Sequence, residues 1–168
     1  MLRPFRVDDA ADVAAACTDP DIVRFTFMDE GLTELEAVKW IERANEWWPH
    51  GHPMFAIVDA NDDRSVGQVG MAFNEHQRSA EAYYWVSPVA RRRRVAFRAL
   101  GLLADWAFDQ GVERLSLLIH PENEPSNRLA QTLGFTREGI LRSYEPFKGS
   151  RPDLVSWSLL PHDLRPWR

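Results

Sequence analysis

Hydrophobic residues along the chain follow two kinds of spacing. Apolar residues repeat with helical spacing after Thr33 and again after Val95, which predicts amphipathic helices in these stretches. Short apolar runs rich in branched and aromatic residues, bounded by Pro, Gly, Asn or Asp, predict strands. We expect strands at 1–5, 54–59, 65–73, 80–86, 114–119, 136–144 and 153–160, and helices at 8–17, 33–48, 95–110 and 123–133. The order β-α-α-β-β-β-α-β-α-β-β predicts an α/β fold with a mixed sheet flanked by helices.

Local signals mark several element boundaries. Thr33 to Glu36 has the sequence of a capping box, and Asn123 is the expected N-cap of the last helix. Residues 21–31 contain apolar side chains without a regular period, so we expect a loop there. Gly67 and Gly70 weaken the strand that contains them, and they indicate a bulge or a close approach of another backbone.

Composition and charge limit the classes of protein to consider. The 168 residues suit one domain, 1–168, with a hydrophobic content of 45% that is typical of a soluble globular protein. The formal net charge of -5 argues against nucleic-acid binding, which usually needs a basic face. The single cysteine, Cys17, excludes an internal disulfide. The sequence has no signal peptide and no apolar run of roughly 20 residues, so we expect a cytoplasmic protein without a membrane partner.

The segment 82–107 combines a strand, a basic turn and a helix. Ala82 to Val86 favours a strand, which Pro88 ends because proline cannot donate to a sheet ladder. Four arginines, Arg91 to Arg94, precede the helix that begins at Val95. Unpaired N–H groups and the helix dipole converge at such a helix start, beside guanidinium groups that match phosphate geometry. The segment predicts a site for a phosphate-bearing ligand, and a solvated basic turn is the alternative.

A family resemblance is carried by three stretches, AYYWVSPVARRRRVAFRALGLLADWAF, NEPSNRLAQTLGFTREGILR and PDLVSWSLL. Together they resemble the GNAT acyl-CoA N-acyltransferase superfamily, and within it the RimJ/RimL-like branch, whose named members acetylate the N-termini of ribosomal proteins. The similarity covers nearly the whole chain. It implies the GNAT fold, with a mixed, mostly antiparallel central sheet of about seven strands flanked by about four helices.

The resemblance also implies a reaction. Acetyl-CoA, or another short acyl-CoA, is the expected donor and co-substrate. The expected acceptor is a primary amine, which in this branch is the N-terminus of a protein or peptide. The implied transfer is direct, without a covalent acyl-enzyme. The five histidines lack ligand spacing, so we expect no metal. A homodimer is compatible with the family, and the sequence leaves the oligomeric state open.

The family's phosphate loop corresponds to consecutive residues of this chain, namely Arg91, Arg92, Arg93, Arg94, Val95 and Ala96. Arg92 and Arg94 depart from the family pattern, which places glycines there so that backbone amides can close on a pyrophosphate. We expect Arg94 to offer its own N–H group if its φ is negative, and its side chain to add charge-assisted hydrogen bonds. The alternative is a side chain that blocks this cradle.

Five further positions match residues that act near the thioester in the family. Backbone N–H groups near Trp85 and Val86 are expected to bind the carbonyl oxygen and the pantetheine arm. Asn123 matches the residue that braces this arm, and Ser126 matches the hydroxyl on the thiolate side. Glu145 matches the branch's proposed general base, which needs a raised pKa or a relayed water. Simpler roles stay open: Asn123 as a helix cap, Ser126 as a residue of the helix start, and Glu145 as an exposed loop acid.

Aromatic residues of the segment 21–53 mark the acceptor side, or else belong to the core; they are Phe25, Phe27, Trp47 and Trp48. The expected substrate-binding residues are Phe27, Trp48, Tyr84 and Glu145. A wide groove between this segment and the loop 145–152 would favour a peptide, whereas a closed aromatic pit would favour a small amine such as an antibiotic or a metabolite. The replaced glycines leave a third alternative, a non-catalytic module that binds CoA.

Overall fold

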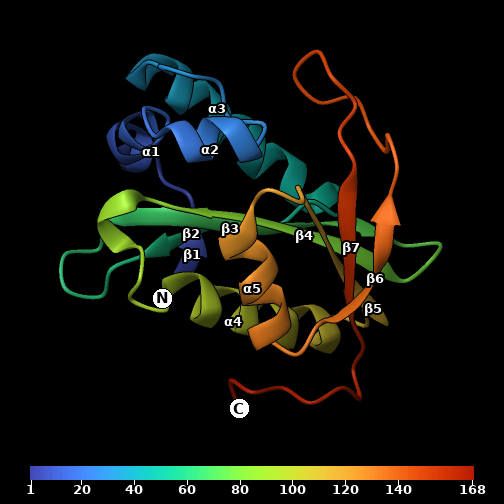
Figure 1. The fold of residues 1–168 in the computed structure, drawn as a ribbon. Coiled ribbons are helices and arrows are strands. Elements are labelled where there is room, and N and C mark those ends of the chain that lie inside the picture. The colour runs from blue at the N-terminus through green and yellow to red at the C-terminus, as the bar shows by residue number, and fades with distance from the viewer.

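A seven-stranded sheet forms the centre of the computed structural model, which describes residues 1–168 (Figure 1). Its strands are β1 (Leu2–Pro4), β2 (Met54–Val58), β3 (Ser65–Asn74), β4 (Ser79–Val86), β5 (Arg114–Ile119), β6 (Thr136–Leu141) and β7 (Leu154–Leu159). They lie in the order β1-β2-β3-β4-β5-β7-β6, and all neighbours are antiparallel except β4 and β5. The predicted mixed, mostly antiparallel sheet is confirmed.

Helices cover both faces of this sheet (Figure 1). One face carries α1 (Ala10–Ala16), α2 (Pro20–Phe25) and α3 (Glu34–Trp47). The other carries α4 (Val95–Asp109) and α5 (Glu124–Thr132). The predicted capping box at the start of α3 is present, and Asn123 accepts a hydrogen bond from the Ser126 N–H group at the start of α5, as expected. None of the helices has the length and apolar character needed to cross a membrane.

The predicted loop at 21–31 is wrong in its first part, which forms α2. Asp19 caps this helix by accepting a hydrogen bond from the Ile22 N–H group at 3.0 Å, and Pro20 lies in its first turn. The helix has six residues, fewer than two turns, so its apolar positions cannot display a helical period. The Asp-Pro pair therefore starts a helix as well as ending the preceding one.

Two glycines bring β3 close to its neighbours, as predicted. A Cβ atom added at Gly67 would lie 2.5 Å from the backbone oxygen of Trp85, and one added at Gly70 would lie 2.8 Å from the ring of Tyr83. The pairing of β2 with β3 also shifts register between Ile57 and Val58. The last strands are shorter than predicted, because the chain leaves β6 at Leu141 and turns toward β7.

Two hydrophobic clusters hold these layers together. One lies between the sheet and α4 and α5, and its fully buried members include Leu100, Leu103, Leu115, Leu133 and Leu159. The other lies between the sheet and α1 to α3, and it includes Val13, Cys17, Ile41, Met28 and Trp85. Since alternate residues of a strand face opposite sides of a sheet, β4 contributes side chains to both clusters.

The parallel strands β4 and β5 separate soon after they begin. They pair only from Ser79 to Glu81 on β4 and from Arg114 to Ser116 on β5. Beyond that point each strand still pairs with its other neighbour, β4 with β3 as far as Val86 and β5 with β7 as far as Ile119. A V-shaped opening therefore forms in the middle of the sheet, and the strand edges that face it retain free backbone groups.

Candidate active site

The opening between β4 and β5 belongs to a large cleft of about 1730 Å³. The cleft reaches from the start of α4, past the separated strands, to α3. Most of the predicted site residues line it, namely Phe27, Tyr84, Trp85, Val86, Arg91, Arg92, Arg94, Val95, Ala96, Asn123, Ser126 and Glu145. Arg93 and Trp48 do not. The fold thus brings together positions that are up to 118 residues apart in the chain (145 − 27).

Unpaired backbone N–H groups gather at one end of the cleft, where α4 begins. The N–H groups of residues 92–97 have no hydrogen-bond partner in the protein, since the first intrahelical bond runs from the Arg98 N–H group to the Arg94 carbonyl. No side chain caps this helix either. The positive end of the α4 dipole adds to these donors. The turn therefore fits the diphosphate of a nucleotide-type ligand such as CoA.

Arg92 and Arg94 both adopt a left-handed backbone, with φ of 59° and 57°. A negative φ at Arg94, the condition attached to the expected contribution of its N–H group, is therefore not met. Glycine adopts this conformation at no steric cost, and an arginine adopts it only when the surrounding structure holds it there. The turn consequently has, at two residues with long basic side chains, the left-handed backbone that glycine adopts most easily.

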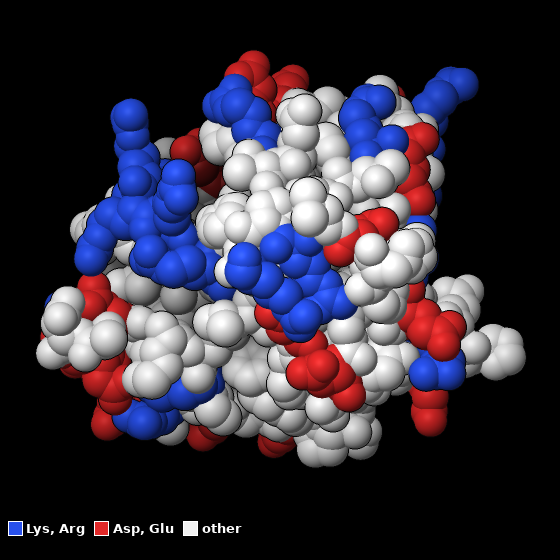
Figure 2. Space-filling model, turned by 90° about the horizontal axis from the view of Figure 1, so that it is seen from below, with Lys and Arg blue, Asp and Glu red and all other residues white.

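The four arginine side chains point in different directions. Arg91 donates to the Val86 carbonyl and to Asp19 of the α2 cap, at 3.2 and 2.5 Å. Arg93 pairs with Asp59 at 3.3 Å and does not line the cleft, and its predicted contact with CoA stays a prediction. Arg92 and Arg94 are exposed, line the cleft and form no ion pair. Figure 2, which views the molecule from below, shows basic side chains gathered on the left, the side on which α4 begins in Figure 1.

A pair of hydroxyl groups lies on the α5 side of the opening. Tyr84 Oη and Ser126 Oγ share a hydrogen bond of 2.8 Å, and either atom can be its donor. Burial raises the pKa of Tyr84 to about 12, so this phenol keeps its proton at neutral pH. Tyr84 packs against the cluster beneath α4 and α5. Tyr84 therefore reaches the cleft from the side of α4 and α5, and its predicted contact with the substrate stays a prediction.

Two carboxylates line the cleft close to each other. Glu145 comes from the loop after β6, and Glu81 lies on β4 where that strand separates from β5. Burial, with a smaller contribution from the Glu145 charge, raises the pKa of Glu81 above its ordinary value. Sequence reasoning missed Glu81. Its signal was an acidic residue inside an otherwise apolar and aromatic strand, two residues before Tyr83 and four before Trp85.

The acceptor-side aromatic residues divide into two groups. Phe25, Phe27 and Trp47 line the cleft. Trp48 turns away from it and packs edge-on against Phe55, with ring centroids 4.6 Å apart. The tryptophan that lines the cleft is therefore Trp47, one residue earlier than the predicted position, because α3 ends there and a short 3-10 turn follows.

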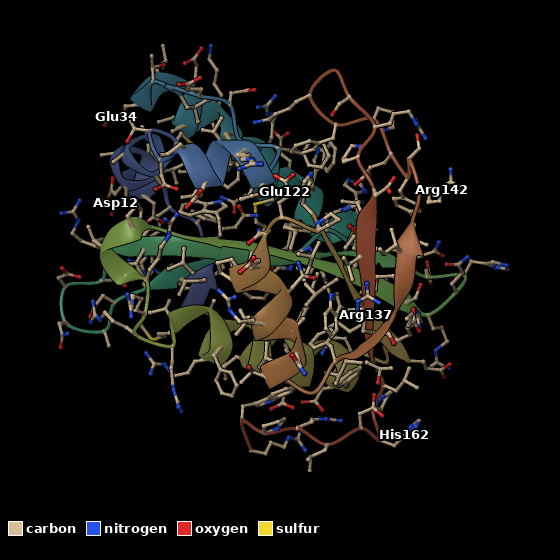
Figure 3. The ribbon with its side chains drawn as sticks, viewed as in Figure 1. Asp12, Glu34, Glu122, Arg137, Arg142 and His162 are labelled. Carbon is tan, nitrogen blue, oxygen red and sulfur yellow. The ribbon has the colours of Figure 1, made fainter.

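The loop between β6 and β7 bridges this end of the cleft to α2. The rings of Phe147 and Phe27 meet edge-on, with centroids 4.9 Å apart. Lys148 donates to the carbonyl oxygens of Val23 and Met28, at 2.6 Å each. Glu122, which precedes α5 near α2, forms an ion pair with Arg24 (Figure 3). These contacts join the loop to α2 and border a passage at the end of the cleft where the acceptor was predicted to bind. No group of three or more His, Cys, Asp or Glu side chains could hold a metal ion.

Comparison with known proteins gives one family. The acetyltransferase (GNAT) domain matches residues 1–136. The N-acetyltransferase p20 of Bacillus licheniformis is 27% identical over 165 residues, which cover 96% of this chain and 93% of that protein.

Solved structures agree with this match. RimJ of Mycobacterium smegmatis in complex with CoA-disulfide is 26% identical, with a TM-score of 0.82, and the likeness covers 95% of this chain and 81% of that chain. The ribosomal-protein-S5-alanine acetyltransferase of Vibrio fischeri has a TM-score of 0.82 at 21% identity, over 98% of this chain and 94% of that chain. At that identity the likeness establishes the fold alone.

Proposed function

Because the chain belongs to the GNAT acetyltransferase family and is an acyl-CoA-dependent N-acetyltransferase, we propose that its acceptor is the α-amine of an extended protein or peptide N-terminus. The observation that carries this proposal is the pair of carboxylates, Glu81 and Glu145, that line the same cleft as the aromatic residues Phe27 and Trp47. With a volume of about 1730 Å³ the cleft is a groove that admits an extended chain end with a cationic amine, and it excludes a folded surface. The resemblance of the sequence to the RimJ/RimL-like branch supports the same acceptor class.

The opposite end of the cleft suits the donor. The N–H groups of residues 92–97 and the guanidinium groups of Arg92 and Arg94 would hold the phosphates of acetyl-CoA. The edge of β4 that faces the opening would hold the pantetheine arm and the acyl carbonyl, because it has no strand partner there. Val86 lies on this edge.

The chain's own side chains would manage the protons. Acetyl-CoA supplies the acetyl group as a thioester. Glu145, beside Glu81, takes one proton from the arriving ammonium group, and the nitrogen–carbon bond then forms as the carbon–sulfur bond breaks. Ser126, supported by the Tyr84 hydroxyl, donates a proton to the departing sulfur. The second proton of the nitrogen restores the hydroxyl pair through solvent, so the protons balance.

A small primary amine is the second candidate acceptor. The contacts of Phe147 with Phe27, and of Lys148 with Val23 and Met28, narrow the acceptor end, and a small molecule would fill such a passage well. The two candidates share the donor end and the proton transfers, and they differ only in what extends beyond the amine.

Thiol release from acetyl-CoA separates these acceptors. The panel contains a short lysine-containing peptide with a free N-terminus, the same peptide with a blocked N-terminus, and a set of small amines. We expect release with the free peptide only, and mass spectrometry should place the acetyl group on the α-amine. Higher kcat/KM for a small amine, or equal turnover of the blocked peptide, would contradict the proposal.

A further inference from the structure

One side-chain polar atom in the cleft is fully buried without a hydrogen-bond partner, namely Nε1 of Trp85. Trp85 is only 5% exposed, and Gln68 beside it is 4% exposed and makes no side-chain hydrogen bond within the protein. Native proteins rarely leave such groups unsatisfied, because each loses its hydrogen bonds to water without replacement. Both residues line the cleft, so a ligand can supply the missing partner.

We propose that Gln68 and Trp85 form a subsite that binds a backbone amide of the acceptor. This inference rests on the proposed function, because it concerns the chain that follows the acceptor's amine. Gln68 and Trp85 are direct partners across β3 and β4, so their side chains lie side by side on one face of the sheet. Trp85 packs in the cluster beneath α1 to α3, which makes this the acceptor-side face.

The period of the strand connects this subsite to the carboxylate. Glu81 and Trp85 are four residues apart on β4, so both side chains point to the same face. At about 3.3 Å per residue they are separated by roughly 13 Å along the strand. An extended acceptor whose amine meets Glu81 and Glu145 reaches Trp85 within about four residues.

The hydrogen-bonding capacity of the pair fits an amide. The Gln68 amide both donates and accepts, whereas the Trp85 indole only donates. A peptide bond offers one carbonyl acceptor and one N–H donor, which satisfies both residues. A polyamine offers cationic donors and no acceptor, so it leaves the indole N–H group unsatisfied. The subsite therefore distinguishes a peptide acceptor from an amine without carbonyl groups.

Glycines on either side of Gln68 hold the pair in position. Gly67 allows the β3 backbone to approach the Trp85 carbonyl, and Gly70 allows the Tyr83 ring to lie across the strand. A side chain at either position would push β3 and β4 apart. The polar pair thus lies on a rigid, regular part of the sheet.

Gln68→Met tests the subsite, because it keeps the length of the side chain and removes its polar atoms. With the wild type, kcat/KM should rise about tenfold as the acceptor is extended from a single amino-acid amide to a tetrapeptide amide. In Gln68→Met this gain should be lost. The Kd of acetyl-CoA should stay unchanged, and the melting temperature should stay unchanged or rise. Gln131→Met, at an exposed glutamine of α5, is the matched control and should keep the full gain.

Two other results would overturn the subsite. One is a length gain that survives in Gln68→Met, and the other is an altered preference among acetyl-, propionyl- and succinyl-CoA, which would assign Gln68 to the donor's acyl group. If the wild type acetylates no peptide, the proposed acceptor class is wrong, and the subsite is then judged by NMR. The Trp85 indole N–H resonance, assigned with Trp85→Phe, should move on titration with N-methylacetamide, and an unmoved resonance rejects the subsite.

Discussion

Individual residues of the turn before α4 combine two opposing features. Arg92 and Arg94 carry the left-handed backbone that closes N–H groups around an anion, and this conformation costs about 1–2 kcal/mol for a residue with a Cβ atom. Their exposed guanidinium groups face the cleft and are not neutralised by an acidic partner. The chain therefore retains a strained backbone together with two free positive charges at the same place.

Exchanging these arginines separates the two features. Arg92→Gly with Arg94→Gly should relieve strain, and we expect the free energy of unfolding to rise by about 1 kcal/mol. The same double variant should weaken acetyl-CoA binding at least tenfold, because two charge-assisted hydrogen bonds are lost. Calorimetry at two salt concentrations measures the affinity, which for the wild type should fall as salt rises. Arg93→Gln is the control, since Arg93 pairs with Asp59, and an equal loss of affinity in it would contradict this assignment.

The carboxylates Glu81 and Glu145 can be separated by their effects on rate and on stability. Glu145→Gln should lower kcat by about 10²–10⁴-fold and remove the acidic limb of the pH–rate profile. Full activity with an intact acidic limb in Glu145→Gln would show that Glu145 is not the base. Loss of the acidic limb in Glu81→Gln would then identify Glu81 as the base.

Glu81→Gln should change the stability of the folded protein in a way that depends on pH. Burial raises the pKa of Glu81 in the folded protein, so folding favours its protonated form. The stability it contributes is fully present below its ordinary pKa of 4.5 and is lost as the pH rises through the folded value. Glu81→Gln should therefore raise the melting temperature at pH 7 and leave it unchanged below pH 4.5. A lower melting temperature at pH 7 would reject a buried charge at this site.

At the scale of elements, the last strands are joined by one carboxylate. Glu138 of β6 accepts two hydrogen bonds from Arg114 of β5, at 2.9 and 2.5 Å. It also accepts bonds from Ser156 and Ser158 of β7, at 3.2 and 2.9 Å. The Arg114 guanidinium is the main reason why the pKa of Glu138 falls to about 2. Three strands that enclose one side of the opening thus share a single ionic centre.

This centre predicts a defined pH dependence. The pKa of Glu138 is lowered in the folded state, so its contribution to stability is present above 4.5 and is lost as the pH falls toward about 2. Glu138→Gln should cost on the order of 1 kcal/mol at pH 7, because solvent screens a side chain that is 37% exposed. Denaturant unfolding at pH 7 and pH 2 measures the difference, which should be much smaller at the lower pH. An equal cost at both values would mean that packing, rather than charge, is lost.

Across the whole molecule, two connections far apart in the sequence close the structure. The loop after β6 reaches α2 above the cleft through Phe147 and Lys148. On the opposite face, the C-terminal segment packs Trp167 on Gly101 of α4, where an added Cβ atom would lie 2.7 Å from the indole. Asp105 of α4 accepts a hydrogen bond from the Trp167 indole at 3.1 Å. The first connection forms a bridge at the cleft, because Phe27 and Phe147 both line it.

Weakening this bridge should change acceptor binding and leave donor binding intact. Phe147→Ala removes an aromatic pair worth about 0.5–1.5 kcal/mol and one wall of the acceptor passage. We expect a higher KM for the acceptor, an unchanged Kd for acetyl-CoA, and faster hydrogen exchange of the α2 amides. Tyr144→Ala, an exposed position of the same loop that does not line the cleft, is the control. Unchanged acceptor KM and unchanged exchange would show that the bridge has no part in binding.

Features that depend on neighbouring residues could be predicted from the sequence. Strand and helix periods, the caps at Thr33 and Asn123, and the close approach at Gly67 and Gly70 are local or follow from side-chain size, so the pattern predicted them. The basic turn before Val95 and the family resemblance likewise depend on consecutive residues, and the match to the GNAT domain confirms the family. Only α2 failed among the helices, because six residues are too few for a period.

Contacts between side chains that are far apart in the chain could be found only from the three-dimensional structure. Because side chains alternate along β4, Glu81 and Trp85 lie on one face of the sheet and Tyr84 lies on the other. There Tyr84 forms a hydrogen bond with Ser126, which is 42 residues later in the chain. Whether Arg93 enters the cleft depends on Asp59, a residue of another element. Ionic and hydrogen-bond partners of this kind are fixed by packing in three dimensions, and no spacing along the chain encodes them.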